Sequence, residues 1–241
     1  MIYFVADIHL GLKAGDPAER EARFVQWLRG LQKPDTEAVY LLGDIWDFWY
    51  EYRDVIPREA VRVTAAIIDL LEYGVKVRYV PGNHDIWLYS FWQSLGVEVL
   101  EQPQLVEACG KKILVGHGDG LGGASRGYRL MLSIFHNRVC QVLFSGLHPW
   151  LAFRFGTDWS NSNRRKHGGY TFKGAEEPLY RYCNAWRCPD GTVPDACVFG
   201  HFHDAVDISL PSGSRLVVLK DWIDGGVHFA CLSDSGDLSL Q

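Results

Sequence analysis

Polar clusters built from Asp, His and Asn recur along this chain, each directly after an apolar run typical of a buried β-strand. The first cluster, Asp7-Ile8-His9, follows the run 2–6. The other four follow the predicted strands 38–42, 75–80, 112–115 and 196–199, and they are Gly43-Asp44-Ile45-Trp46-Asp47, Pro81-Gly82-Asn83-His84-Asp85, Gly116-His117-Gly118-Asp119 and Gly200-His201-Phe202-His203. Because ligands bind where the carboxyl ends of neighbouring strands meet in an α/β sheet, we expect these clusters to converge.

The donor set of these clusters predicts a site for divalent cations. Carboxylate and amide oxygens with imidazole nitrogens, and no thiolate, suit Mn²⁺, Fe or Zn²⁺. The donors are enough for two ions about 3.5–4 Å apart, bridged by one carboxylate. Asp44 is the natural bridge, because its short side chain follows a glycine turn. Any single motif is more often a turn or a core histidine, but five in chain order are hard to explain in that way.

The elements that must position these clusters alternate between strand and helix patterns, which indicates an α/β fold. One helix is predicted between the first two strands. Asp16 can cap it, Pro17 suits its first turn, and Phe24, Leu28 and Leu31 share one face.

A second helix is predicted from about 57 to 73. Val61, Ala65, Ile68 and Leu71 would form its buried stripe, and Gly74 would end it. The C-terminal part alternates again and predicts three more strands, at 206–210, 215–219 and 227–232.

At the polar clusters the chain resembles the calcineurin-like metallophosphoesterases, whose pattern is D-x-H, G-D-x-x-D, G-N-H-D/E, G-H and G-H-x-H. The resemblance runs from Asp7 to His203. It implies one domain over 1–241, a β-sandwich of two mixed sheets flanked by helices. It also implies two metal sites that share Asp44; the first would be completed by Asp7, His9 and His203, and the second by Asn83, His117 and His201.

The resemblance further implies hydrolysis of a phosphoester or phosphoanhydride by a metal-activated water. His84 would protonate the leaving oxygen or stabilise the transition state, with Asp85 orienting its imidazole. Asp47 and Asp119 would align ligand histidines. A plain structural role for these two acids, as turn or helix-cap residues, is about as probable on the sequence alone.

The segment 121–175 differs in charge from the rest of the chain. It has eight cationic residues and one anionic residue, a net charge of +7, against −12 elsewhere, and it is rich in aromatic residues. A basic, apolar segment suits an anionic lipid-like ligand or a membrane surface. An ordinary helical subdomain with buried aromatics fits it equally well.

The runs 4–11, 41–49 and 219–223 are similar to the UDP-2,3-diacylglucosamine diphosphatases of lipid A synthesis. That similarity implies a Mn²⁺-dependent attack of water on the α-phosphorus, which gives 2,3-diacylglucosamine 1-phosphate and UMP. It also makes 121–175 a helical lid over the acyl chains. The residues implied to contact the substrate are Asn83, His84, Ser160, Asn163, Arg164 and Lys166, although the Ser, Asn and Lys series is about one residue short. Many members of that family have Arg where this chain has His84.

The remaining features bound the setting of the protein. The N-terminus has no basic region before its apolar run, and the six cysteines form no CxxC pair, so we expect a cytoplasmic protein with reduced thiols. The apolar stretch 139–155 is too short and too broken to span a bilayer. The basic, aromatic segment 121–175 instead predicts peripheral association with the inner face of the inner membrane. A net charge of −5 argues against nucleic acid.

Two alternatives and one open question remain at this point. The chain could act on another nucleotide or phosphodiester substrate, or it could be a non-catalytic scaffold that docks a partner or a membrane. The oligomeric state is open.

Overall fold

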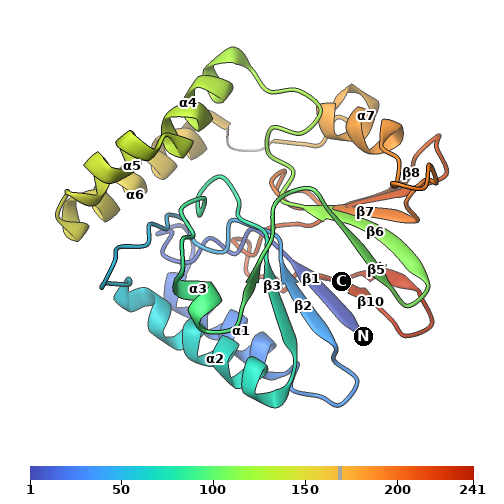
Figure 1. The fold of residues 1–241 in the computed structure, drawn as a ribbon, viewed down its shortest axis with the longest axis horizontal. Coiled ribbons are helices and arrows are strands. Elements are labelled where there is room, and N and C mark those ends of the chain that lie inside the picture. Colours follow the sequence, from blue (N-terminus) through green and yellow to red (C-terminus); the bar gives the residue numbers. More distant parts are fainter. Residues whose placement is uncertain (168–169) are drawn as a thin grey trace.

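The computed structural model describes the backbone of residues 1–167 and 170–241 and the side chains of residues 1–161 and 170–241. Two β-sheets pack face to face, with helices on their outer faces (Figure 1). The six-stranded sheet has the order β11-β10-β1-β2-β3-β4 and the five-stranded sheet the order β5-β6-β7-β9-β8. Both sheets mix parallel and antiparallel pairs. The predicted fold class, an α/β fold with two mixed sheets flanked by helices, is therefore confirmed.

The strands of the first sheet are β1 (Ile2–Val5), β2 (Ala38–Leu41), β3 (Lys76–Tyr79), β4 (Glu98–Val99), β10 (Ala230–Leu232) and β11 (Leu238–Leu240). Those of the second are β5 (Gln104–Ala108), β6 (Lys111–Gly116), β7 (Ala196–Phe199), β8 (Val206–Ser209) and β9 (Arg215–Val218). The eight strands predicted from the sequence are present, and β4, β5 and β11 were not predicted.

Both faces of the first sheet are covered. In β1, Ile2 and Phe4 point into the core between the two sheets, whereas Tyr3 and Val5 point into the core beneath α1 (Pro17–Arg29) and α2 (Val61–Tyr73). This alternation follows from the two-residue period of a strand. It makes β1 and β2 apolar and buried throughout, so the polar side chains next to them come where these strands end.

The first predicted helix is confirmed as α1. The carboxylate of Asp16 accepts the N–H groups of Ala18 and Glu19 at 3.0 Å and caps the helix. Phe24 and Leu28 are fully buried in the core beneath the first sheet.

The second predicted helix is present, but the face assigned to it was wrong. A 3₁₀ turn, Arg58–Ala60, precedes α2, and Gly74 ends it in the left-handed conformation, as predicted. The fully buried residues are Val63, Ala66, Ile67 and Leu70, and Val61 is exposed. Both sets repeat every three to four residues, so the apolar pattern allowed either face, and packing on the sheet selected one.

The helical arm, residues 126–167, extends away from the two-sheet body (Figure 1). It consists of α4 (Arg126–His136), α5 (Arg138–Ser145) and α6 (Pro149–His167), all within the segment of unusual charge. Phe135, Phe144 and Phe153 pack inward against Phe48 and Trp87 of the body. Other apolar side chains of the arm are exposed, namely Leu130, Ile134, Val139, Val142, Leu143, Leu147, Trp150, Leu151 and Phe155.

The remaining helical elements are short: α3 (Phe91–Ser94), the 3₁₀ turn Gly174–Glu176, and α7 (Pro178–Ala185), which covers the outer face of the second sheet. None of the helices in the described part of the chain combines the length and apolar character that crossing a membrane requires.

Candidate metal centre

The five polar clusters meet where strands of both sheets end. Asp7 and His9 follow β1, Asp44 follows β2, and Asn83 follows β3. His117 follows β6, and His201 and His203 follow β7. The structure therefore brings together donors that are far apart in the sequence, as in the hydrogen bond from the His201 N–H to the Asp7 carboxylate, 194 residues away, at 2.8 Å.

Two carboxylates lie at the middle of this arrangement. Asp44 Oδ2 is 3.4 Å from His117 Nε2 and 3.8 Å from His9 Nε2. Asp7 Oδ1 is 3.7 Å from His9 Nε2 and 3.6 Å from His203 Nε2. The ligand atoms of two groups, Asp7–His9–His203 and Asp7–Asp44–His117, each lie within 4.8 Å of one another. Asp7 is common to both groups, and Asp44 of the second group also faces His9 of the first; the bridging role of Asp44 stays a prediction.

The other two predicted ligands are next to His117. Asn83 Oδ1 is 3.3 Å from His117 Nε2, and the His201 ring is centred 5.0 Å from the His117 ring. All seven predicted ligands are therefore gathered in one place.

Three of the histidines present one nitrogen to the carboxylates and the other to an oxygen. His117 Nδ1 is 2.9 Å from the Leu42 carbonyl oxygen, and His203 Nδ1 is 2.7 Å from Asp221 Oδ2. His9 Nδ1 is 3.4 Å from Asp47 Oδ1. Oxygen partners that hold Nδ1–H leave the lone pair of Nε2 free to bind a cation, which is the usual arrangement of metal-binding histidines.

The electrostatics of the cluster also favour a bound cation. Burial raises the pKa of Asp44, but the imidazoles of His117 and His84 together lower it by more than burial raises it. The pKa of Asp44 therefore lies well below its ordinary value. Burial lowers the pKa of His117, but the Asp44 carboxylate raises it well above its ordinary value. Asp7 Oδ1 is buried and accepts no hydrogen bond from the described residues. A cation bound here would neutralise the Asp7 and Asp44 carboxylates and take the place of the proton on His117 Nε2, so the residues fit a two-metal centre.

Five of the ligand residues have a left-handed backbone, with φ of 55° at Asp7, 50° at His9, 52° at Asp44, 73° at His201 and 56° at His203. Such strain in non-glycine residues is concentrated at functional sites. Glycines give the strained loops room: a Cβ atom at Gly82 would overlap the Asp44 carboxylate, and one at Gly200 would overlap the Asp7 carboxylate.

The structure corrects the expectation for Asp85. Its carboxylate is fully buried and accepts the backbone N–H groups of Asp44, Ile45, Trp46 and Gly82 and the hydroxyl of Tyr79. It therefore holds the loop of Asp44 in place and does not orient an imidazole.

The ring of His84 is oriented by a main-chain oxygen. Its Nδ1 is 2.8 Å from the Asp47 carbonyl oxygen, and its Nε2 is 3.9 Å from Asp44 Oδ2. Burial lowers the pKa of His84. Trp159 of α6 lies against the ring, with centroids 5.4 Å apart.

The two acids expected to align ligand histidines differ in how they do so. Asp47 faces His9 directly, as described above. The Asp119 carboxylate accepts the Tyr128 hydroxyl at 2.8 Å and a hydrogen bond from the Gln102 amide. Gln102 in turn accepts the backbone N–H of His117 at 2.9 Å. Asp119 therefore acts on the main chain of His117 through Gln102 and not on its ring.

Ser160 does not face a substrate site in this structure. It is fully buried, and its hydroxyl donates to Asp47 Oδ1 at 2.9 Å. The resemblance implied that Ser160 contacts the substrate, whereas α6 turns it toward the body. The side chains of Asn163, Arg164 and Lys166 lie outside the described residues.

Three residues of the site were missed by sequence reasoning. Asp221 holds His203, and it follows β9 just as the predicted ligands follow their strands, so its position was a usable signal. Arg20 is buried and donates to the carbonyl oxygens of His9 and Leu12 at 3.1 and 2.6 Å. It precedes Phe24 by four residues on the apolar face of α1, and a cation on that face was also a signal. Gln102 carried no signal.

Comparisons with known proteins agree with this geometry. The model of the calcineurin-like phosphoesterase family matches residues 1–205. A UDP-2,3-diacylglucosamine hydrolase from Porphyromonas gingivalis is 32% identical over 92% of this chain and 90% of that protein. One from Yersinia pseudotuberculosis is 30% identical over 98% of this chain and 96% of that protein.

A solved dimetal phosphatase from Danio rerio shares the fold, with a TM-score of 0.52 at 16% identity over 96% of this chain and 92% of that one. The match to the family model covers most of the chain, and the Asp, Asn and His donors of the family pattern converge at one place. The chain therefore belongs to the calcineurin-like phosphoesterase family and is a metal-dependent phosphoesterase.

Proposed function

We propose that this protein hydrolyses the diphosphate of UDP-2,3-diacylglucosamine in lipid A biosynthesis. Water attacks the α-phosphorus, the bond to the bridging oxygen breaks, and the products are UMP and 2,3-diacylglucosamine 1-phosphate. The observation that carries this proposal is the similarity to UDP-2,3-diacylglucosamine hydrolases over 90% or more of both chains, the helical arm included.

In this proposal the clustered side chains hold two Mn²⁺ ions. Asp7, His9, Asp44 and His203 form the first site, and Asp44, Asn83, His117 and His201 the second. Two bound divalent ions supply a water of lowered pKa and neutralise charge on the phosphoryl oxygens. The protein contributes rigidity: the Nδ1 partners of three histidines and the four N–H groups on Asp85 fix the ligand geometry in advance.

His84 has the position of a residue that contacts the phosphoryl group. The Asp47 carbonyl oxygen can only accept, so His84 Nδ1 carries a proton and donates it there. Its Nε2 is then free to take up a second proton and to donate it to the leaving oxygen of the sugar phosphate. Because burial lowers the pKa of His84, the protonated ring is a stronger acid than an exposed imidazole.

The helical arm would hold the acyl chains and rest on an anionic membrane surface. Exposed apolar side chains occur on all three of its helices. Four exposed cations lie among them, namely Arg126, Arg129, Arg138 and Arg154. Apolar side chains beside cations suit the boundary between headgroups and acyl chains. The proposal thus places the protein in the cytoplasm, peripherally bound at the inner face of the inner membrane, with the arm as a lid.

The test of substrate compares release of UMP from UDP-2,3-diacylglucosamine with turnover of UDP-N-acetylglucosamine and bis-p-nitrophenyl phosphate, with and without Mn²⁺. Fast Mn²⁺-dependent turnover of the diacyl substrate alone is the expected result. If the small substrates were turned over as fast as the diacyl substrate, the acylated substrate would be the wrong assignment. The protein would then be a general phosphodiesterase.

The test of membrane binding is sedimentation with vesicles that contain an anionic lipid, at low salt. A Leu143→Glu, Trp150→Glu variant should stay in the supernatant. The matched control is Val61→Glu, Tyr73→Glu, which introduces the same two charges at exposed apolar residues of α2, outside the arm. If the wild-type protein also stays in the supernatant, the membrane part of the proposal is wrong.

A further inference from the structure

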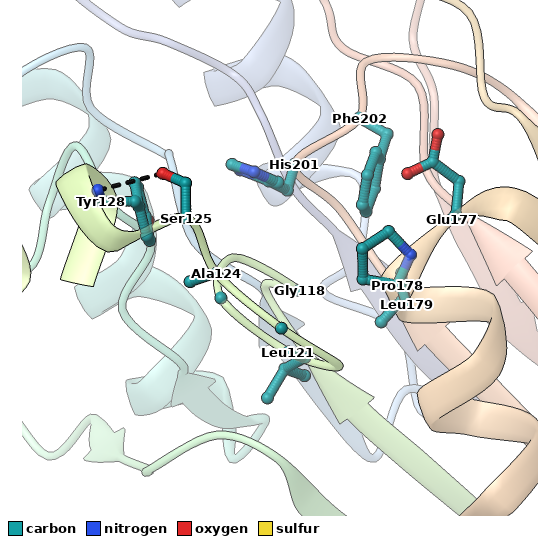
Figure 2. A pocket seen from close by; sticks show the side chains of 12 residues that line it. Gly118, Leu121, Ala124, Ser125, Tyr128, Glu177, Pro178, Leu179, His201 and Phe202 are labelled. Carbon is teal, nitrogen blue, oxygen red and sulfur yellow. Dashed lines mark hydrogen bonds between the residues drawn. The ribbon is translucent and has the colours of Figure 1, made fainter.

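A cavity of about 250 Å³ opens beside the metal cluster. Three segments line it: the glycine-rich loop from Gly118 to Ser125 with Tyr128 of α4, the start of α7 at Glu177, Pro178 and Leu179, and the pair His201 and Phe202. Figure 2 shows Ser125 and Tyr128 on one side of this space and His201, Phe202 and Glu177 on the other. None of the roles proposed above uses this cavity.

The cavity is continuous with the site of chemistry because His201 forms part of its wall. His201 neighbours His117, whose Nε2 faces Asp44. His84 also lies beside Asp44 and His9. It contacts the arm through Trp159. A substrate centred on Asp44 therefore extends toward the arm past His84 and toward the cavity past His201.

The charge of the lining excludes a phosphate as the main occupant. Glu177 is the one charged side chain among the lining residues, all of which lie in the described part of the chain, and no Lys or Arg is among them. A phosphate group in proteins is usually met by Arg, Lys or several N–H donors. A carboxylate instead favours a neutral ligand that donates hydrogen bonds, such as a diol or a ring N–H.

Glu177 is held in a fixed position. It is only 4% exposed, and its Oε1 accepts the Tyr170 hydroxyl and the Lys173 N–H, the latter at 3.1 Å. Its Oε2 receives no hydrogen bond from a described residue and can accept two donors from a ligand. A vicinal diol presents two adjacent hydroxyl donors, the number that Oε2 can accept.

Phe202 supplies a flat apolar face beside this carboxylate. It is only partly buried, and it packs against Phe172 with ring centroids 5.3 Å apart, which keeps the ring in place. The glycine-rich loop packs closely on the start of α7, because a Cβ atom at Gly122 would overlap the carbonyl group of Pro178. Aromatic rings in such settings stack on planar bases.

We propose that this cavity binds the nucleoside half of the substrate, with the base on Phe202 and the ribose hydroxyls on Glu177. This inference rests on the proposed function, since it assumes a nucleotide sugar. The acylated sugar must lie at the arm, where apolar side chains are exposed. The nucleoside at the other end of the diphosphate then extends from the metal cluster on the side of His201. The cavity is below the ~300–1,000 Å³ typical of drug-sized ligands and suits one nucleoside better than two acyl chains.

The test measures the dissociation constants of UMP, 2′-deoxyuridine monophosphate, ribose 5-phosphate and inorganic phosphate with the Mn²⁺-loaded full chain, by calorimetry. We expect UMP to bind at least about tenfold more tightly than inorganic phosphate, because the base and the diol add contacts. Phe202→Leu should weaken UMP about fivefold or more and leave inorganic phosphate unchanged. Ribose 5-phosphate should not respond to Phe202→Leu, because it lacks a base.

Glu177→Gln should weaken UMP about tenfold and remove the preference for UMP over its 2′-deoxy form. Glu176→Gln is the matched control, since Glu176 is adjacent but exposed, and it should bind all four probes as the wild type does. Phe202→Leu keeps the inference testable if Glu177→Gln does not fold. Equal affinities for UMP and inorganic phosphate, or equal weakening of both by Phe202→Leu, would overturn the nucleoside site.

These outcomes separate the inference from the proposed function. If the diacyl substrate is hydrolysed but the Phe202 and Glu177 variants bind UMP normally, the nucleoside site is wrong and the proposed function stands. If UMP binding follows the variants but the diacyl substrate is not hydrolysed, the cavity is a nucleotide site of a phosphoesterase with another substrate.

Discussion

Two of the residues through which helix α6 contacts the body lie one helical turn apart. Gly156 packs so closely on Phe48 that a Cβ atom there would overlap the ring, and Ser160 donates to the Asp47 carboxylate at 2.9 Å. Gly156 and Ser160 share one helix face because they are four residues apart, and their partners Phe48 and Asp47 are consecutive. A movement of α6 therefore loosens the Gly156–Phe48 contact and the Ser160–Asp47 hydrogen bond together. Gly156→Ala is the smallest change that forces this movement.

The expected cost of Gly156→Ala combines opposing contributions to the free energy of unfolding. Ala stabilises a helix interior relative to Gly by ~0.5–1 kcal/mol, whereas overpacking costs ~1–3 kcal/mol. A Cβ atom at Gly156 would lie 2.2 Å from ring carbons of Phe48, whereas carbon atoms in contact are about 3.5–4.0 Å apart, so α6 must move by roughly 1–2 Å. That movement breaks the bond from Ser160 to the charged Asp47, which is worth ~1.5–3 kcal/mol. Because α6 can relax part of the overlap, we expect a net loss of about 1–3 kcal/mol.

Urea unfolding and thermal melting measure this loss, at about 2–4 °C in Tm for each kcal/mol in a chain of this size. Gly127→Ala in α4 is the matched control. A Cβ atom at Gly127 meets no atom within 4 Å, so that variant should be as stable as the wild type or slightly more stable. Because Asp47 also faces His9, Gly156→Ala should lower Mn²⁺ affinity as well, and Gly127→Ala should not.

A second substitution identifies the cause. Phe48→Leu makes room for the added methyl group and should recover at least about 1 kcal/mol in the Gly156→Ala background, relative to its effect in the wild type. If Gly156→Ala is as stable as Gly127→Ala and binds Mn²⁺ normally, then α6 is not seated on Phe48 and the arm does not support His9.

Three further predictions concern the partners of the ligand loops and one surface ion pair. Asp85→Ala leaves four buried N–H groups without their acceptor and should cost at least ~3 kcal/mol in urea unfolding; a stable variant that had lost only activity would instead assign Asp85 to the chemistry. Asp221→Ala should weaken Mn²⁺ about 10–100-fold in calorimetry, because His203 loses the carboxylate on its Nδ1, and unchanged affinity would refute this. Arg215 lowers the pKa of Asp207, so the stabilisation by their ion pair is complete above pH ~4 and is lost as the pH falls through the lower folded pKa of Asp207. Both side chains are more than a third exposed, so Arg215→Gln should remove only ~0.2–1 kcal/mol at pH 7 and progressively less as the pH falls below ~4.

The metal ligands were predictable because the fold confines them to a few positions. Central strands such as β1 are buried on both faces, so an Asp or His that directly follows such a strand is at the edge where ligands bind. This reasoning identified Asp7, Asp44 and His117, and it would have identified Asp221 after β9 had it been applied there.

The face of α2 and the role of Ser160 could not be predicted by the same reasoning. Two sets of residues in α2 have helical spacing, and only contact with the sheet distinguishes them. Ser160 and Asp47 are 113 residues apart, and no local pattern says that α6 returns to the end of β2. The partner of a ligand depends on tertiary packing even where the ligand itself can be read from its strand.

The partners of the ligand loops also explain how the strained backbone is held. The N–H of Asp7 donates to the Gly43 carbonyl oxygen at 3.1 Å, and that of His9 donates to the Asp44 carbonyl oxygen at 3.0 Å. The loops after β1 and β2 therefore hold each other, and Asp85 holds the second of them from beneath. A left-handed residue outside glycine costs ~1–3 kcal/mol, so a loop with two of them relaxes unless both ends are tied. Damage to either loop should consequently displace Asp7 and Asp44 together, and the two metal sites should be lost as one unit.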